Sequence, residues 1–142
     1  MIFTKTEEQA VVKAIKAAET KTSGEIRVFI EEVCDAEHPL ERAALLFQEY
    51  EMTSTRERNG VLLYIATASR QFAIWGDSGI HQRLGQQFWE AEKHLLRQFL
   101  QKDMACEGVC AAIAKIGDAL KTHFPAQSKD NPNELPDDII YG

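Results

Sequence analysis

The first part of the chain changes from a helical to a strand-like hydrophobic period. Over residues 11–18, apolar side chains recur every three or four positions, the spacing of a helix with one buried face. Thr6 and Gln9 have the spacing of a capping box, so we expect this helix to begin at Thr6. Over residues 25–31, every second side chain is a branched apolar one, which predicts a β-strand with one better-buried face.

The middle of the chain predicts a helix followed by a hairpin. Pro39 suits the first turn of a helix that ends near Met52. The apolar face of this helix is expected to contain Leu40, Ala43, Phe47 and Tyr50. Residues 61–66 form a nearly continuous apolar run, and residues 71–75 follow after a short polar break, which indicates two hairpin strands. The order strand, helix, strand predicts a right-handed crossover, with the first two strands parallel and the third antiparallel.

Two long helical stripes follow residue 79, with a break near Lys102 and Asp103. Their apolar members are Phe88, Trp89, Leu95, Leu96, Phe99 and Leu100 in the first stripe, and Val109, Ile113, Ile116 and Leu120 in the second. From Pro125 onward, Ser, Asn, Pro and acidic residues dominate. We therefore expect one α/β domain over residues 1–125, in which helices cover a small mixed sheet, and an extended acidic tail over residues 126–142.

The length and composition are those of a single globular domain. The chain has 142 residues, of which 44% are hydrophobic and 27% charged, enough for one packed core. No apolar stretch approaches the roughly 20 residues of a membrane-spanning helix, and no basic segment leads into a secretory cleavage site. These features predict a cytoplasmic protein without a direct membrane span. The net charge of −6 is shared evenly between the two halves, so we expect neither nucleic acid nor an anionic membrane surface as a partner.

The three cysteines are an odd number without metal-finger spacing, which fits free thiols in a reducing compartment. Cys106 and Cys110 lie one helical turn apart and can ligate a metal if a histidine or another cysteine approaches. Small thiols on an apolar helix face are more often packing residues, so we expect these two in the core.

Polar side chains from three separate segments are predicted to meet at one edge of the sheet. The hairpin brings the glycine-bounded loop 76–79 back beside Arg58 and Asn59. A parallel first strand starts at the same edge, with Glu25. Asp77, aided by Glu25, can ligate a hard divalent cation at this point.

The loop also opens a predicted helix, where backbone N–H groups can bind an anion. Such an anion would be bound or positioned by Arg58, Asn59, Gly76, Ser78 and Gly79. The same residues have a structural alternative, in which Asp77 caps the helix, Arg58 pairs with an acid, and the glycines turn the chain. The loop lacks the spacing of dinucleotide-binding and P-loop fingerprints.

Two other features carry candidate chemistry. The acidic run from Glu31 to His38, at the carboxyl end of the first strand, is a second candidate metal site, although a solvated acidic loop is favoured. Glu92 falls within the apolar stripe of a helix, where a charge is costly unless it is paired or its pKa is raised. Such a carboxylate can act as a general acid or base, but we favour a helix rotated outward, with Glu92 exposed.

Four segments together resemble the TPM-domain family, which is named for thylakoid-lumen, photosystem-repair and receptor-modulator members. They are Thr22–Val28, Arg58–Ile65, Phe72–Ile80 and Asn133–Asp138. The resemblance covers nearly the whole chain and is closest to the small soluble bacterial branch, in which the domain stands without a membrane anchor. It implies a three-layer α/β/α sandwich with a short mixed, mostly parallel sheet.

The resemblance implies several activities. Some family members are described as acid phosphatases, some bind a divalent metal in a crevice, and others are assembly modules without assigned chemistry. Bacterial members are often encoded beside LemA-family membrane proteins. This chain departs from the larger anchored branch, because Ala68 and Ser69 stand where acidic residues are common and residues 83–86 contain no acid.

Two hypotheses follow. The first is a non-enzymatic protein-interaction or assembly module, with a LemA-family protein as the partner that the resemblance implies. The alternative is a metal-dependent hydrolase of phosphate esters. In that case Asp77 and Glu25 hold Ca²⁺, Mg²⁺, Mn²⁺ or Zn²⁺, while Arg58 and Asn59 orient the phosphate oxygens. We rank the first higher because metal-assisted hydrolysis requires several carboxylates at the cation.

Overall fold

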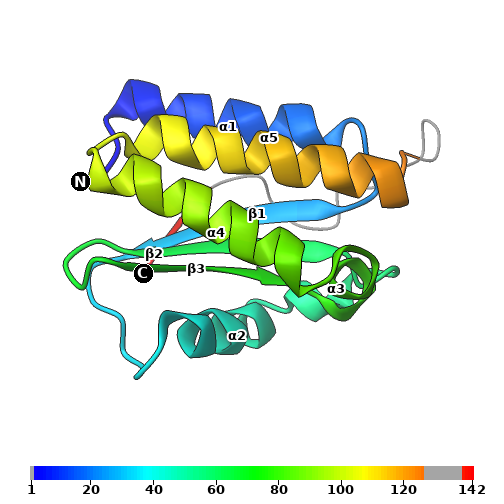
Figure 1. The fold of residues 1–142 in the computed structure, drawn as a ribbon, viewed down its shortest axis with the longest axis horizontal. Helices are drawn as coiled ribbons and strands as arrows, with labels where there is room; N and C mark the ends of the chain where they lie inside the picture. The colour runs from blue at the N-terminus through cyan, green and yellow to red at the C-terminus, as the bar shows by residue number, and fades with distance from the viewer. Residues whose placement is uncertain (1, 127–138) are drawn as a thin grey trace.

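Four strands form one sheet in the order β3-β2-β1-β4 (Figure 1). The computed structural model describes residues 2–126 and 139–142. The strands are β1 (Glu25–Glu31), β2 (Gly60–Ala66), β3 (Gln71–Gly76) and β4 (Ile140–Tyr141). β1 is parallel to both β2 and β4, whereas β3 is antiparallel to β2. The predicted crossover and hairpin are thus confirmed, and the sheet is mixed and mostly parallel.

Helices cover both faces of this sheet (Figure 1). On one face lie α1 (Lys5–Glu19), α4 (Gln86–Gln101) and α5 (Ala105–His123), and on the other lies α2 (Pro39–Glu49). The short α3 (Ser78–Leu84) follows β3, and a 3-10 turn, η1 (Met52–Ser54), follows α2. The expected α/β/α sandwich is therefore confirmed. No helix in the described residues is long and apolar enough to cross a membrane.

The alternation of side chains along the strands divides the core into two layers. Ile26, Val28 and Ile30 of β1 pack against the α1 and α5 side, whereas Phe29 packs against the α2 side. β2 is buried along its whole length, as its continuous apolar run predicts for a strand covered on both faces. Gly117 lets α1 and α5 approach closely, because a Cβ atom there would lie 2.8 Å from the Cβ of Ala18.

The first helix begins earlier than expected. Thr4, not Thr6, is its N-cap: the Thr4 hydroxyl accepts from the Glu7 N–H at 3.1 Å, and the Glu7 carboxylate accepts from the Thr4 N–H at 2.9 Å. The predicted capping box of Thr6 and Gln9 is therefore wrong. Phe3 is only 2% exposed, so its burial in the core fixes the chain directly before Thr4.

One other expectation needs correction. On α2, Leu40 and Tyr50 are exposed rather than buried, and Leu46 takes their place in the core with Ala43 and Phe47. At the C-terminus, Ile140 and Tyr141 of the predicted extended tail pair with β1 as a short strand. Residues 127–138, the rest of the predicted acidic tail, lie outside the described residues.

Candidate functional site

Arg58 and Asp77 meet at the edge where β2 begins and β3 ends, as the hairpin predicts. The Arg58 guanidinium donates two hydrogen bonds to the Asp77 carboxylate, Nε to Oδ2 and Nη2 to Oδ1, each at 2.7 Å. This two-point geometry is the strongest form of an arginine–carboxylate pair. Asp77 is buried, whereas the Arg58 side chain is 48% exposed, so the pair lies at the surface of the domain.

Asp77 is also the N-cap of α3. Its Oδ1 atom accepts from the Ser78 N–H at 2.7 Å. Both carboxylate oxygens are therefore engaged by protein donors, which is the structural alternative that the sequence left open. A cation bound here would compete with Arg58 for the same oxygen atoms.

The backbone donors at the start of α3 are engaged in the same way. The Gly79 and Ile80 N–H groups both donate to the Arg58 carbonyl, at 2.8 Å and 3.3 Å. Gly79 permits this contact, because a Cβ atom there would lie 2.1 Å from the Glu57 carbonyl oxygen. Gly76 is similarly close to Trp89, because a Cβ atom on Gly76 would lie 2.4 Å from Cζ2 of the Trp89 ring. An anion at the predicted position would have to displace the Arg58 carbonyl.

Glu25 and Asn59 lie at the same edge but are buried. The Asn59 side-chain amide donates to the Ser23 hydroxyl at 3.2 Å, and its backbone N–H donates to the Thr55 hydroxyl at 3.3 Å. Glu25 is 2% exposed, and its backbone N–H donates to the Asn59 carbonyl at 3.4 Å. Within the described part of the chain, Glu25 and Asp77 belong to no group of three metal-ligating side chains.

A groove of about 690 Å³ runs along the outer side of β3, and the sequence analysis did not identify it. Its floor is residues 72–78, and its two walls come from the start of α2 and from α4. The residues of these walls are the N-cap His38 with Pro39 and Leu40 of α2, and Gln86, Trp89, Glu90 and Lys93 from α4. Arg58 and Asp77 lie at one end. The sequence contains a signal for this open edge, because the last strand of a predicted hairpin lies at the edge of the sheet unless another strand pairs with it.

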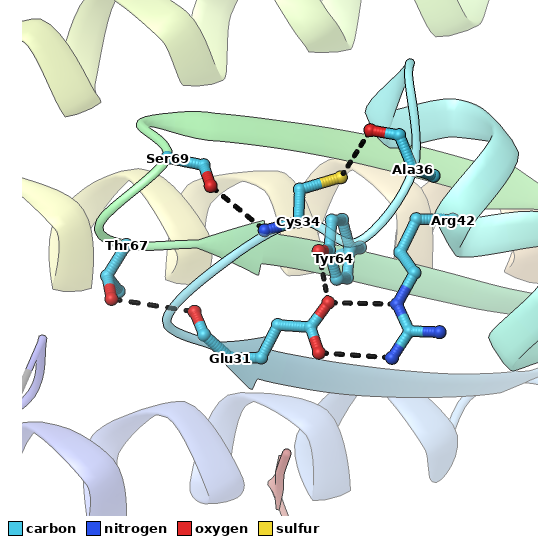
Figure 2. A network of polar contacts seen from close by, with 7 residues as sticks. All are labelled: Glu31, Cys34, Ala36, Arg42, Tyr64, Thr67 and Ser69. Atoms are coloured by element: carbon cyan, nitrogen blue, oxygen red, sulfur yellow. Dashed lines mark hydrogen bonds and ion pairs between the residues drawn. The ribbon is translucent and has the colours of Figure 1, made fainter.

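A second polar cluster occupies the opposite end of the sheet, where β1 ends (Figure 2). The Glu31 carboxylate accepts from Arg42 Nε at 2.9 Å, from Arg42 Nη2 at 3.1 Å, and from the Tyr64 hydroxyl. Burial alone would raise the pKa of Glu31, but the hydrogen bonds from Arg42 and Tyr64, with the charge of Arg42, lower it. Beside this cluster, the Cys34 N–H donates to the Ser69 hydroxyl at 2.9 Å (Figure 2).

This second cluster links the β1–α2 connection to the end of β2. Because both Glu31 oxygens have protein donors, the carboxylate is not available as a simple metal ligand. The acidic side chains that follow it in the loop, Glu32, Asp35 and Glu37, are exposed to solvent. This arrangement fits the solvated loop that the sequence favours over a metal site.

Glu92 lies on α4 and is only 4% exposed, so the expectation of an outward-rotated helix is wrong. Its Oε1 atom has no hydrogen-bond partner among the described residues. Burial raises the pKa of Glu92, and the charge of Lys115 on α5 offsets part of this effect. Glu92 does not line the groove. The structure therefore separates Glu92 from Arg58 and Asp77.

The profile of the TPM domain matches residues 1–119. The chain is similar to the BA42 protein of the psychrophilic bacterium Bizionia argentinensis, with 36% identity and a TM-score of 0.90 over 99% of this chain and 95% of that one. It is also similar in fold to the N-terminal domain of the cg2496 protein of Corynebacterium glutamicum, with 18% identity and a TM-score of 0.58 over 87% of this chain and 74% of that one. No curated protein matches. The chain belongs to the TPM-domain family.

Proposed function

We propose that this TPM domain is a non-enzymatic protein-interaction module that binds an extended segment of a partner protein along β3. The observation that supports this proposal is the groove beside an open strand edge. Among the described residues, no strand lies beyond β3. An exposed strand edge pairs readily with an added strand, whose main-chain hydrogen bonds provide affinity.

The register of the hairpin indicates which backbone groups are offered. The Asp77 N–H donates to the Gly60 carbonyl at 2.9 Å, and hydrogen-bonded pairs alternate along an antiparallel ladder. The N–H and C=O groups of Phe72, Ile74 and Gly76 therefore point away from β2. An added strand would bind to these three residues.

The walls of the groove offer side-chain contacts on both sides of such a strand. Leu40 of α2 is 47% exposed and provides an apolar contact. On the opposite wall, Glu90 and Lys93 of α4 provide charges of both signs. The other edge strand, β4, is only two residues long and therefore offers a much shorter ladder.

The test uses peptides selected from a displayed random library against the full chain. We expect the selected peptides to shift the backbone amide resonances of Phe72, Ile74 and Gly76 and to slow their hydrogen exchange. Methylation of alternate peptide amides should abolish binding in one register and spare it in the other, because only one edge of the peptide pairs with β3. Peptides that bind without affecting these amides would overturn the proposal.

Leu40→Asp provides a second test, with Leu45→Asp as its matched control. Both leucines are exposed on α2, but only Leu40 lines the groove. Leu40→Asp should weaken peptide binding by about tenfold or more, whereas Leu45→Asp should leave it unchanged. Equal affinities of the two variants would contradict a binding site in this groove. A LemA-family protein, the partner implied by family resemblance, can be tested with the same two variants.

Phosphate-ester hydrolysis has weaker support from the geometry. Asp77, its proposed cation ligand, already accepts from Arg58 and from the Ser78 N–H. Turnover of p-nitrophenyl phosphate with Mg²⁺, Ca²⁺, Mn²⁺ or Zn²⁺ would test it directly. Saturable turnover that is lost in Asp77→Asn, with the fold retained, would replace the interaction proposal by the hydrolase.

A further inference from the structure

We propose that the chain binds a thiophilic divalent cation, such as Zn²⁺, between the first turns of α1 and α5. The ligands are the thiolates of Cys106 and Cys110 and the carboxylates of Glu7 and Glu107. This site is separate from the groove, so the proposal does not depend on the proposed function.

The arrangement of the helices brings these residues together. α1 and α5 run side by side in the same direction, and both begin at the left of Figure 1. Glu7 lies in the first turn of α1, and Cys106 and Glu107 lie in the first turn of α5. Residues that are about a hundred positions apart in the sequence therefore meet at one end of the helical layer.

Three of the ligand atoms already lie close to one another. The Cys106 Sγ atom and one carboxylate oxygen each from Glu7 and Glu107 are all within 4.8 Å of one another. The Cys106 thiol also donates to the Glu7 backbone carbonyl, at 3.8 Å from sulfur to oxygen. Small rotations of these side chains would bring the three atoms to a common cation.

Cys110 supplies the fourth ligand. It lies one helical turn after Cys106 on α5, outside the three atoms that are within 4.8 Å of one another, so its side chain must rotate to bring its sulfur to the cation. Both cysteines are only partly buried at the margin of the core, so a cation can reach them from solvent. The two cysteines therefore pack against the core, as expected, but they are not enclosed by it. Carboxylates, rather than a histidine or a third cysteine, complete the set.

The charge of the cluster also favours a cation. Two carboxylates face the thiols, and among the described residues neither Glu7 nor Glu107 has an ion-pair partner. Glu7 uses its Oε1 atom to accept from the Thr4 N–H, so its Oε2 atom is the one available for a cation.

The ligand set determines which cation fits. Two thiolates favour soft or borderline cations over Mg²⁺ and Ca²⁺, which prefer oxygen ligands. Two sulfur and two oxygen ligands match the tetrahedral preference of Zn²⁺. The two S–H bonds break as the two metal–sulfur bonds form, and both protons go to solvent.

The experiment is a titration of the reduced full chain with Cd²⁺, which gives an ultraviolet thiolate-to-metal charge-transfer band. We expect one cation per chain, release of two protons per cation, and loss of the band when Zn²⁺ is added in competition. Binding of Zn²⁺ should also raise the midpoint of thermal unfolding, because the folded chain brings all four ligands together and so binds the cation more tightly than the unfolded chain does.

Variants separate this site from adventitious binding. Cys106→Ser should remove most of the charge-transfer band. It should also weaken Cd²⁺ binding by more than about a hundredfold, because replacing a residue that only supports a metal ligand already costs about tenfold to hundredfold. Cys110→Ser should act similarly. Cys34→Ser is the matched control, because Cys34 lies in the loop after β1, away from the proposed site. Its replacement should leave both the charge-transfer band and the Cd²⁺ affinity unchanged. Glu107→Gln, at an exposed position, should weaken binding but keep the band.

Three results would overturn the proposal. They are the absence of a saturable band, equal Cd²⁺ affinity in Cys106→Ser and the unmodified chain, and a ratio of two chains per cation. Circular dichroism of each variant shows whether the fold is retained. If Cys106→Ser does not fold, Glu107→Gln decides the question, because that carboxylate makes no ion pair among the described residues and the amide keeps the shape of the side chain.

Discussion

Glu31, partly buried at the end of β1, and Glu92, buried on α4, lie on opposite sides of one sheet, and their surroundings differ completely. Glu31 accepts from Arg42 and from Tyr64, so its pKa is lowered although its burial acts in the opposite direction. Glu92 has an oxygen without a hydrogen-bond donor among the described residues, and burial raises its pKa. Burial alone therefore does not determine what a carboxylate contributes. The hydrogen-bond donors around a carboxylate decide whether its pKa is lowered or raised.

The difference indicates that the ionised Glu31 stabilises the fold, whereas the ionised Glu92 destabilises it. The lowered pKa of Glu31 means that it stabilises the fold above the pKa of the unfolded chain, and this contribution is lost as the pH falls. For Glu92 the sign is opposite. A raised pKa in the folded state means that the cost is absent at low pH and develops as the pH rises above the unfolded-state pKa.

The largest expected effect comes from removal of the cation that compensates Glu31. Arg42→Met should lower the free energy of unfolding at pH 7 by about 2–3 kcal/mol, because it leaves the Glu31 side chain, only 10% exposed, with Tyr64 alone as a donor. The loss is below that of a fully buried pair, since the Arg42 side chain is 22% exposed. Urea unfolding measures this change. Arg56→Met, at an exposed position, is the control, and equal losses in both variants would contradict the role of Arg42.

A change of opposite sign is expected at Glu92. Glu92→Leu should raise the free energy of unfolding by about 1–2 kcal/mol at pH 7, because it removes a buried carboxylate charge, one oxygen of which has no donor among the described residues. The gain should shrink as the pH falls toward and below the unfolded-state pKa of a glutamate, because the cost of the charge is then lost. Glu90→Leu on the same helix is exposed and should change stability by less than about 0.5 kcal/mol. A gain at Glu92 that is independent of pH would indicate better packing rather than removal of a charge.

The smallest effect is expected from the neutral donor. Tyr64→Phe keeps the buried ring and removes only the hydroxyl that donates to Glu31. The free energy of unfolding should fall by about 1 kcal/mol, and acid unfolding should begin at higher pH because Glu31 loses one of the bonds that lower its pKa. If the acid-unfolding midpoint is unchanged, Arg42 alone sets the charge of Glu31.

Local patterns were sufficient for much of the architecture. The alternation over residues 25–31 and the apolar run over 61–66 are properties of neighbouring residues, and they indicate strands regardless of what packs on them. The crossover and hairpin rules then fixed the strand directions. These rules also explain why the proximity of Arg58 and Asp77 was predictable, because a short hairpin joins their two strands.

The local rules failed where two signals of similar strength competed. Thr4 and Thr6 both precede residues that can complete a capping box, and only the burial of Phe3 decided between them. On α2, Leu40 and Leu46 are equally apolar, but the angle of the helix on the sheet buries Leu46 and exposes Leu40. This angle depends on the whole interface, not on the helix sequence.

The sequence by itself determined most of the elements, the directions of the first three strands and the pairing of residues that short connections bring together. Only the tertiary structure decided that the donors around Asp77 were already engaged, that Glu92 was buried, and that Glu7 lay beside Cys106. The physical reason is the range of the interactions. Periods and turns act over a few residues, whereas the contact between α1 and α5 depends on packing at positions such as Ala18 and Gly117, distant in sequence.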